Sequence, residues 1–269
     1  MPASISANFD AKAEFSLSVS RALHILSSFS REHPEWGLSE LSRAMKLSKG
    51  SVSRFLQALE MHGYVDRDPQ TRLYRPGPEV ARVGSLYHSA GRLRQLAMPI
   101  MRDLVQRVGF TSYVSEMRDD QMLILAALEG PGPIKYTIPV GTKLPVHSTA
   151  TGQSALAQLS SEDVGKLVVR TGLSADTKFT VTTKAALLKR LAEVRANGYS
   201  VNWEERTLGV GSVAAPVNAA DGTPLCVLSL GFATSQVKKD QIAALGRETK
   251  SSAKQLAKIL AEKGIVRVE

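Results

Sequence analysis

Residues 38–63 read LSELSRAMKLSKGSVSRFLQALEMHG, and this stretch predicts two helices joined by a tight turn. The first half repeats its apolar residues at helical spacing, with Leu38 and Leu41 on one stripe. The interruption that follows, at 46–48, is short. Two helices with so short a connection are typical of a helix-turn-helix.

The second half of this stretch predicts an amphipathic helix that begins after Ser48. The side-chain oxygen of Ser48 can cap the first turn, and Gly63 can adopt the left-handed conformation at the end. The apolar residues repeat at i, i+3, i+4 and i+7: Val52, Phe55, Leu56 and Leu59. The opposite face carries short polar side chains, as expected of a recognition helix that enters the major groove.

Polar residues at the start and on the open face of this helix are candidate DNA contacts. They are Ser48, Lys49, Ser51, Ser53, Arg54 and Gln57. Serine and lysine near a helix start suit phosphate, because free N–H groups lie there, whereas Arg54 and Gln57 can reach base edges. The alternative is a small helical bundle with a solvated basic face. The hairpin predicted next disfavours that alternative.

Two short β-type runs follow in YVDRDPQTRLYRP, residues 64–76, around a turn that Asp68 and Pro69 favour. This hairpin is the expected wing. We expect Arg72, Tyr74 and Arg75 to contact neighbouring phosphates.

The rest of the first domain is predicted by its flanking segments. Residues 1–16 are small and polar and are expected to form a flexible tail. A first helix starts near Ser18 or Ser20, so the winged helix-turn-helix occupies 17–77.

Amphipathic helices are predicted from Pro78 to Val108, and residues 78–97 are assigned as a linker between two domains. Gly91 and Pro99 indicate a bend or restart in this region.

After Gly109 the pattern changes to strands, and residues 98–269 are expected to form a second domain. The predicted strands are TSYVSEM, QMLILAALEG, IKYTIPV, YSVNW, GSVAAPVN and PLCVLSLGF. The predicted helices are HSTATGQSALAQL, SSEDVGKLVVR, KAALLKRLAEVRANG and KKDQIAALGRETKSSAKQLAKIL. Helices segregated around an antiparallel sheet indicate an α+β sensor-like domain.

Composition agrees with a two-domain globular protein of 269 residues. The net charge of +9 is compatible with a polyanionic partner, and basic residues outnumber acidic ones between 43 and 94. No apolar run is long enough to cross a membrane, and the N-terminus lacks a secretory pattern. The single cysteine, Cys226, lies in an apolar run. We therefore expect a cytoplasmic protein with no membrane association.

No catalytic residue, metal site or cofactor is predicted. Residues 209–214 satisfy a loose G-x-G-x-x-A, but they lead into a strand instead of a helix. His147 beside Ser148 lacks a nucleophile elbow, and no histidine or cysteine spacing suits a metal. Ala150 and Thr151, at a helix start, can offer backbone N–H groups to an anion. An ordinary helix cap without a ligand is the alternative.

Six blocks in a fixed order resemble the isocitrate lyase regulator (IclR) family of bacterial transcription factors, from about Leu17 to Leu260. SVSRALHILSSF, LSELSRAMKLSKGSVSRFLQALEMHGYVDRD and YRPGPEVARVGSLY resemble its winged DNA-binding region. VGTKLPVHSTATGQSALA, LAEVRANGYSVNWEERTLGVGSVAAPV and DGTPLCVLSLGF resemble its effector domain. The resemblance implies a GAF/PAS-like α+β effector domain with an antiparallel sheet. It also implies homodimers, often paired into tetramers, that bind double-stranded operator DNA and respond to a small organic acid.

The resemblance further implies which residues contact the effector. Backbone contacts fall on Ala150 and Thr151, and side-chain positions on Asn202, Ser212 and Ser229, with Gly231 following. Some members have an acidic residue at 202, a cysteine at 212 and a serine at 231. The site expected here is roomier and less acidic, so we expect an aromatic or medium-sized organic acid. The competing hypothesis is an enzyme, or an effector-free interaction protein, that uses the C-terminal α+β domain.

Overall fold

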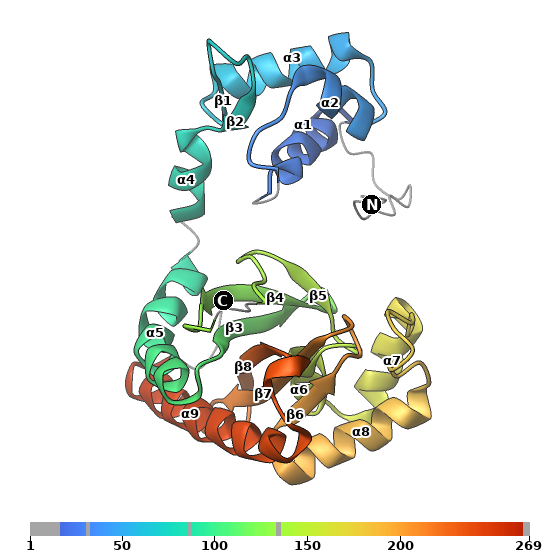
Figure 1. The fold of residues 1–269 in the computed structure, drawn as a ribbon, viewed down its shortest axis with the longest axis vertical. Helices are drawn as coiled ribbons and strands as arrows, with labels where there is room; N and C mark the ends of the chain where they lie inside the picture. Colours follow the sequence, from blue (N-terminus) through green and yellow to red (C-terminus); the bar gives the residue numbers. More distant parts are fainter. Residues whose placement is uncertain (1–16, 31–32, 86–87, 133–135, 266–269) are drawn as a thin grey trace. The chain divides into compact units, whose positions relative to one another are not determined.

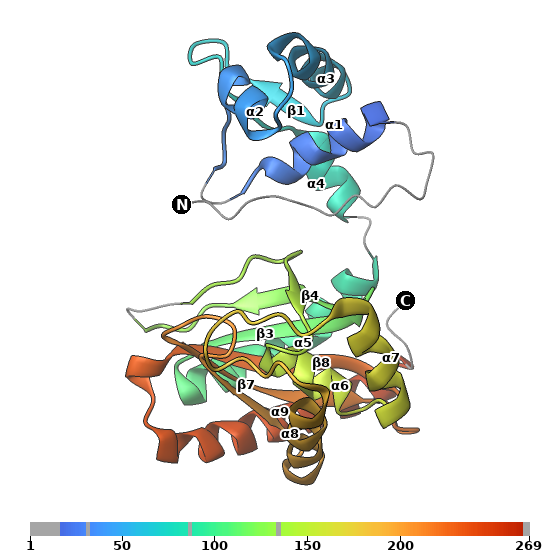
Figure 2. The ribbon, with the colours of Figure 1, turned by 90° about the vertical axis from the view of Figure 1, so that its right-hand side faces the viewer.

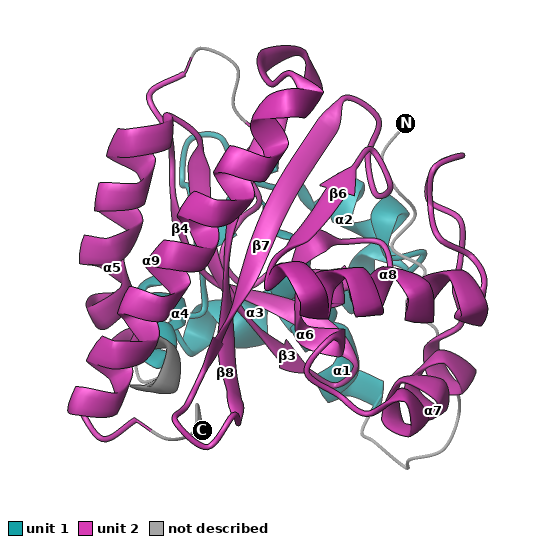
Figure 3. Cartoon of the chain, turned by 90° about the horizontal axis from the view of Figure 1, so that it is seen from below, with its two compact units in different colours: residues 1–87 teal, residues 88–269 magenta. Residues whose placement is uncertain are grey.

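The structure is a computed structural model whose chain divides into two compact units, residues 1–87 and 88–269 (Figures 1 and 3). It describes residues 17–30, 33–85, 88–132 and 136–265. The expected flexible tail, residues 1–16, lies outside the described residues.

The first unit is a winged helix-turn-helix, as the sequence predicted. Its elements are α1 (Leu17–Ser28), α2 (Leu38–Ala44), α3 (Lys49–Met61), β1 (Val65–Arg67), β2 (Tyr74–Pro76) and α4 (Pro78–Ser85). Helices and wing share one small core, formed by Ile25, Leu41, Val52, Leu56, Val65 and Tyr74. Strands β1 and β2 pair in antiparallel register, and Trp36 bridges to Tyr74. The hydrophobic stripe of α3 therefore fixes the helix against α1 and the wing, and its polar face is left open.

Helix α5 (His88–Val108) continues through Gly91 and Pro99, so the chain does not restart a helix at these residues. The buried side chains of α5 recur about every turn, at Leu93, Ala97, Met101 and Leu104. Packing of this stripe stabilises the helix more than the missing N–H of one proline destabilises it. The predicted linker, 78–97, overlaps α4 of the first unit and the first half of α5.

The second unit is built on a six-stranded antiparallel sheet with the order β5-β4-β3-β8-β7-β6. The strands are β3 (Thr111–Arg118), β4 (Gln121–Leu128), β5 (Lys143–Pro145), β6 (Ser200–Trp203), β7 (Val210–Asn218) and β8 (Pro224–Ala233). The central pair, β3 and β8, joins segments from opposite ends of the unit, with Tyr113 opposite Ser229.

One predicted strand is wrong: none of the described residues in 136–140 of IKYTIPV is in a strand. The edge strand β5 lies further on, where Leu144 pairs with Met122 of β4. A turn closes this connection, because Gly141 donates its backbone N–H to the Ile124 carbonyl and has a φ of 89°. Glycine suits that backbone conformation.

Two helical layers cover the two faces of the sheet (Figures 2 and 3). Helices α5 and α9 (Ile242–Glu262) pack against one face around a core that includes Leu104, Leu228 and Leu256. Helices α6 (Ala150–Leu156), α7 (Ser161–Thr171) and α8 (Lys184–Asn197) lie on the other face around a second core. Two single turns of 3₁₀ helix, η1 (Thr234–Gln236) and η2 (Lys239–Gln241), precede α9. The α+β architecture expected from the sequence is confirmed.

Helix α6 approaches the preceding chain so closely that it requires glycine at position 152. An added Cβ on Gly152 would lie 2.2 Å from both the Cα and the carbonyl oxygen of Val146. Backbone atoms cannot move aside as a flexible side chain can. This contact sets how the loop before α6 lies against the first turn of the helix.

We therefore expect Gly152→Ala to lower the free energy of unfolding of the second unit by about 1–3 kcal/mol or more, through overpacking. The matched control is Gly91→Ala in α5, because nothing lies within 4 Å of its added Cβ. That change should raise stability by roughly 0.5–1 kcal/mol. Thermal and denaturant unfolding would measure both. Equal stability of the two variants would show that the close approach does not constrain the fold.

Candidate DNA-binding surface and effector pocket

The start of α3 is organised by two serines that bond to each other. Ser48 is the N-cap: its Oγ accepts the backbone N–H of Ser51 at 3.2 Å and lies 2.9 Å from the Ser51 Oγ. Lys49, Arg54 and Gln57 are exposed, whereas Ser51 and Ser53 are half-buried. The predicted contact residues thus comprise three serines, of which Ser48 and Ser51 form the cap, and three long exposed side chains, those of Lys49, Arg54 and Gln57.

The wing presents its arginines and buries its tyrosine. Arg72 and Arg75 are exposed, but Tyr74 is only 4% exposed and belongs to the core of the unit. In β2 the side chains alternate, so Tyr74 points inward where Arg75 points outward. The Arg67 guanidinium lies 5.4 Å from the centre of the Tyr74 ring. The ring of Tyr74 thus packs the wing against the helices, so at most its hydroxyl end can reach a phosphate, unlike the exposed side chains of Arg72 and Arg75.

An aspartate shapes the turn of the wing. One carboxylate oxygen of Asp68 accepts the backbone N–H groups of Gln70 and Thr71, both at 2.8 Å. These two hydrogen bonds, that from Thr71 first, lower the pKa of Asp68 below its ordinary value. The charged form of Asp68 is therefore the form that holds the turn in front of Arg72.

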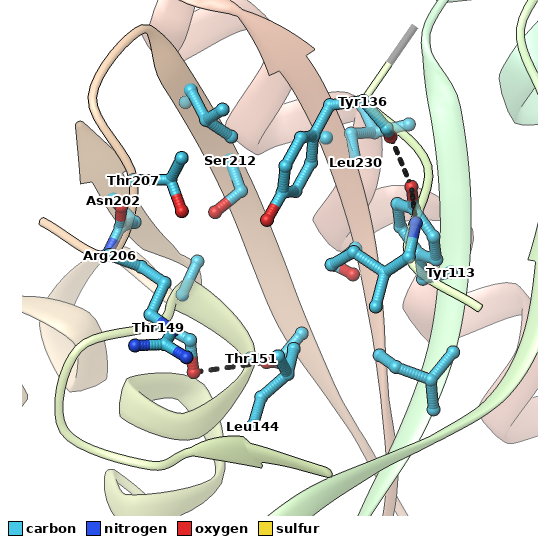
Figure 4. A pocket seen from close by; sticks show the side chains of 17 residues that line it. Tyr113, Tyr136, Leu144, Thr149, Thr151, Asn202, Arg206, Thr207, Ser212 and Leu230 are labelled. Carbon is cyan, nitrogen blue, oxygen red and sulfur yellow. Dashed lines mark hydrogen bonds between the residues drawn. The ribbon is translucent and has the colours of Figure 1, made fainter. Parts of the chain in front are cut away.

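A pocket opens on the α6 side of the sheet in the second unit (Figure 4). Its walls come from β3, β4, β6, β7, β8, the chain around 136–138 and the start of α6. All of the predicted effector residues line it: Ala150, Thr151, Asn202, Ser212, Ser229 and Gly231.

The first turn of α6 offers two backbone N–H groups at the pocket wall. Thr149 caps the helix: its Oγ1 accepts the N–H of Gly152 at 3.1 Å, and its carbonyl accepts that of Gln153 at 2.9 Å. The N–H groups of Ala150 and Thr151 have no protein partner among the described residues. First-turn donors are left over by helix geometry and need a cap, water or ligand. These are the amides that the sequence assigned to an effector.

Asn202 lines the pocket, but both polar atoms of its side chain form hydrogen bonds within the protein. Its Nδ2 donates to the Ser148 carbonyl at 2.8 Å, and its Oδ1 accepts the N–H of Glu205 at 3.3 Å. It is 3% exposed. Asn202 therefore ties the end of β6 to the loop before α6, and one amide hydrogen remains for a ligand.

The far end of the pocket is closed by tyrosines that sequence reasoning missed. The Tyr113 hydroxyl donates to the Tyr136 carbonyl and accepts the N–H of Ile138 at 3.2 Å. Burial raises the pKa of Tyr113 to about 12, so its hydroxyl is neutral. An added Cβ on Gly231 would lie 3.2 Å from the Tyr113 ring, so a larger residue at 231 would crowd this wall.

Arg206 also lines the pocket and was not predicted from the sequence. Of the described residues that line the pocket, it is the one that carries a charge (Figure 4). It stands in the loop between β6 and β7, where it forms an ion pair with Asp176. A single arginine in a polar loop carries no local pattern, and so periodicity gave no reason to select it.

Among the described residues, no group of three or more histidine, cysteine, aspartate or glutamate residues is arranged to hold a metal ion. Within the same residues, no helix is both long and apolar enough to cross a bilayer.

The fold and these two sites define a class: a DNA-binding regulator whose second domain holds a small-molecule pocket. Residues 18–69 match the family described as "IclR helix-turn-helix domain", and residues 86–258 match "Bacterial transcriptional regulator IclR C-terminal". The chain belongs to the IclR family of transcriptional regulators. This is a family of regulators and not of enzymes, so the enzyme hypothesis is set aside.

Relatives match over almost the whole chain. The chain is 30% identical over 244 residues to the HTH-type transcriptional regulator XynR of Escherichia coli K12, a match that covers 90% of this chain and 96% of that protein. It is 28% identical over 241 residues to the transcriptional repressor IclR of the same strain, covering 89% of this chain and 88% of that protein.

Solved structures share the fold. An IclR transcriptional regulator from Alicyclobacillus acidocaldarius matches with a TM-score of 0.75 and 26% identity, covering 91% of this chain and 99% of that chain. An IclR homologue from Microbacterium hydrocarbonoxydans, complexed with 4-hydroxybenzoate, matches with a TM-score of 0.74 and 22% identity, covering 90% of this chain and 99% of that chain.

The Asp68 turn yields a pH prediction for the wing. Because the pKa of Asp68 is lower in the folded protein than in the unfolded chain, its contribution to stability is present above the unfolded value. That contribution is lost as the pH falls through the lowered pKa. We expect the N–H resonances of Gln70 and Thr71 to titrate together in that acidic window. In Asp68→Asn they should not titrate, because the amide does not ionise in this pH range while its oxygen still accepts both hydrogen bonds. Asp66→Asn is the control, and titration that survives Asp68→Asn would contradict this explanation.

Proposed function

We propose that this protein is a ligand-responsive regulator that represses or activates a catabolic operon and senses a small organic or aromatic acid. The observation that carries the proposal is the composition of the pocket as far as the chain is described: apolar and aromatic walls, the cation Arg206 and the first-turn N–H groups of Ala150 and Thr151. A carboxylate is the group that this combination recognises, because Arg and helix-terminal amides both donate to anions.

The remaining walls support an aromatic or medium-sized body for the effector. Ile124, Ile138 and Leu144 supply apolar surface, and Tyr113 with Tyr136 supplies ring faces. Ser212 and Ser229 offer hydroxyls beyond the amides, where a second polar group of the effector would lie. The homologue complexed with 4-hydroxybenzoate supports the same ligand class.

Operator binding would use the first unit. Arg54 and Gln57 on α3 would read base edges, and Ser48, Lys49, Ser51 and Ser53 would hold the helix start at the phosphates. On the wing, Arg72 and Arg75 would contact the backbone. Two copies of the chain would engage paired half-sites as a homodimer in the cytoplasm, and such dimers would pair into tetramers.

Effector binding would act on DNA affinity through two states of the protein. An acid that binds one state better shifts the population toward it, and the size of the shift is limited by its differential affinity. The helical region 78–97 would transmit the change to the spacing of the paired DNA-binding units.

The ligand class can be tested by calorimetric titration of the full chain with 4-hydroxybenzoate and a panel of catabolic acids. We expect an aromatic or medium-sized acid to bind, and 4-hydroxybenzamide, its uncharged counterpart, to bind at least tenfold more weakly. Arg206→Leu should remove this preference for the charged form. Binding restricted to small α-keto acids would contradict the proposed ligand class.

The DNA contacts can be tested on the DNA upstream of the protein's own gene, with scrambled DNA of the same length as reference. Arg54→Ala and Gln57→Ala should reduce the preference for the natural sequence by about 1–3 kcal/mol. Lys49→Ala should weaken binding to both DNAs alike. It should also reduce the slope of log affinity against log salt concentration by about one. An equal loss on both DNAs for Arg54→Ala would reassign that residue to phosphate contact.

A further inference from the structure

The ion pair at the pocket mouth joins the pocket to a segment that does not line it. Arg206 lines the pocket, whereas its partner Asp176 stands in the irregular segment 172–183 between α7 and α8. The Asp176 side chain is 18% exposed, and that of Arg206 is 39% exposed. Among the described lining residues, the one cation is therefore already paired with a carboxylate of the protein.

The second oxygen of Asp176 is also engaged close to the first turn of α6. It accepts the Ser148 hydroxyl at 2.7 Å, and Ser148 is fully buried two residues before Ala150. The Asp176 carboxylate thus has an arginine on one oxygen and a hydroxyl on the other. An effector carboxylate between Arg206 and the backbone N–H groups of Ala150 and Thr151 would likewise bind a guanidinium on one side and neutral donors on the other.

The segment around Asp176 is held at its ends by Leu173 and Val181, which pack against the second core, and between them by polar contacts. Ser174 bonds through its carbonyl to a His147 ring nitrogen at 2.9 Å. The hydroxyls of Thr177 and Thr180 donate to the backbone carbonyls of Glu204 and Glu205 at 2.6 Å each. All of these contacts fall on the two loops that flank the pocket. Loss of the Asp176 pair would therefore loosen this segment without unfolding a helix or strand.

On the basis of the proposed acid-sensing function, we infer that Asp176 is an internal competitor for Arg206 and that the effector carboxylate displaces it. Two carboxylates beside one guanidinium repel each other, most strongly where water is partly excluded. The arriving acid raises the free energy of the Asp176–Arg206 pair, and the pair in turn weakens binding of the acid. Asp176 would therefore set the concentration at which the effector binds. Segment 172–183 would loosen when the effector displaces Asp176.

Another role for Asp176 makes the opposite prediction. Arginine has five N–H donors, so Asp176 could orient Arg206 toward a ligand that shares it. Removal of an orienting residue weakens acid binding, whereas removal of a competitor strengthens it. The sign of the change distinguishes the two roles.

The test compares the wild type with Asp176→Asn, using 4-hydroxybenzoate and the neutral 4-hydroxybenzamide as probes in calorimetry. We expect the variant to bind the acid about fivefold or more tightly, with no change for the amide. Asp120→Asn is the matched control: it removes a carboxylate from the Arg170 ion pair, and neither of those residues lines the pocket. It should leave both affinities unchanged. Weaker or equal acid binding by Asp176→Asn would overturn the inference.

Hydrogen–deuterium exchange gives a second readout that is independent of affinity. Exchange in 172–183 should rise in ligand-free Asp176→Asn and in ligand-free Arg206→Gln, to a similar extent, and in the wild type when the acid is bound. Unchanged or slower exchange with the acid bound would contradict displacement. If the acid binds neither the wild type nor Asp176→Asn, the proposed ligand class fails as well. Equal binding to both defeats the competition alone.

Discussion

The complete burial of helix α6 is the constraint on which the effector unit depends. All seven residues of this helix are buried, between the sheet and α8. A buried helix must satisfy its polar groups internally or leave them to a ligand. Gln153 donates both to the His147 carbonyl and to the Glu205 carboxylate, and Ser200 donates to the Ala150 carbonyl. Among the described residues, the first-turn amides of Ala150 and Thr151 have no protein partner at the pocket, and the buried side-chain oxygens Gln153 Oε1 and Ser154 Oγ have none either.

The same burial links the pocket to the surrounding elements. Glu205 is 4% exposed, and it accepts Gln153 from α6 at 2.9 Å and Arg190 from α8 at 2.7 Å. Its neighbour Arg206 therefore extends from a fixed point, although its own side chain is partly exposed. A rigid anchor at Glu205 next to the movable Asp176–Arg206 ion pair suits a sensor. Ligand binding can then change the ion pair while the anchored residues stay in place.

Features that depend on local sequence were predictable. Ser48 as a cap, the Val52–Leu59 stripe, Gly63 and the Asp68 turn all depend on residues within a few positions of one another. Features set by distant partners were not. The edge strand β5 is placed by its pairing with β4, and α5 continues through Pro99 because its stripe is buried. The inward direction of Tyr74 depends on the register of a three-residue strand. The ion pair between Asp176 and Arg206 joins residues 30 positions apart.

The proposed regulation requires that an effector in the pocket changes affinity for DNA. The dissociation constant for the DNA upstream of the protein's own gene, measured by fluorescence anisotropy at fixed salt without an acid and with a saturating acid from the panel, reports this coupling. We expect a change of about fivefold or more, matched by an equal change in affinity for the acid when the DNA is bound. The same dissociation constant with an empty and a filled pocket would contradict it.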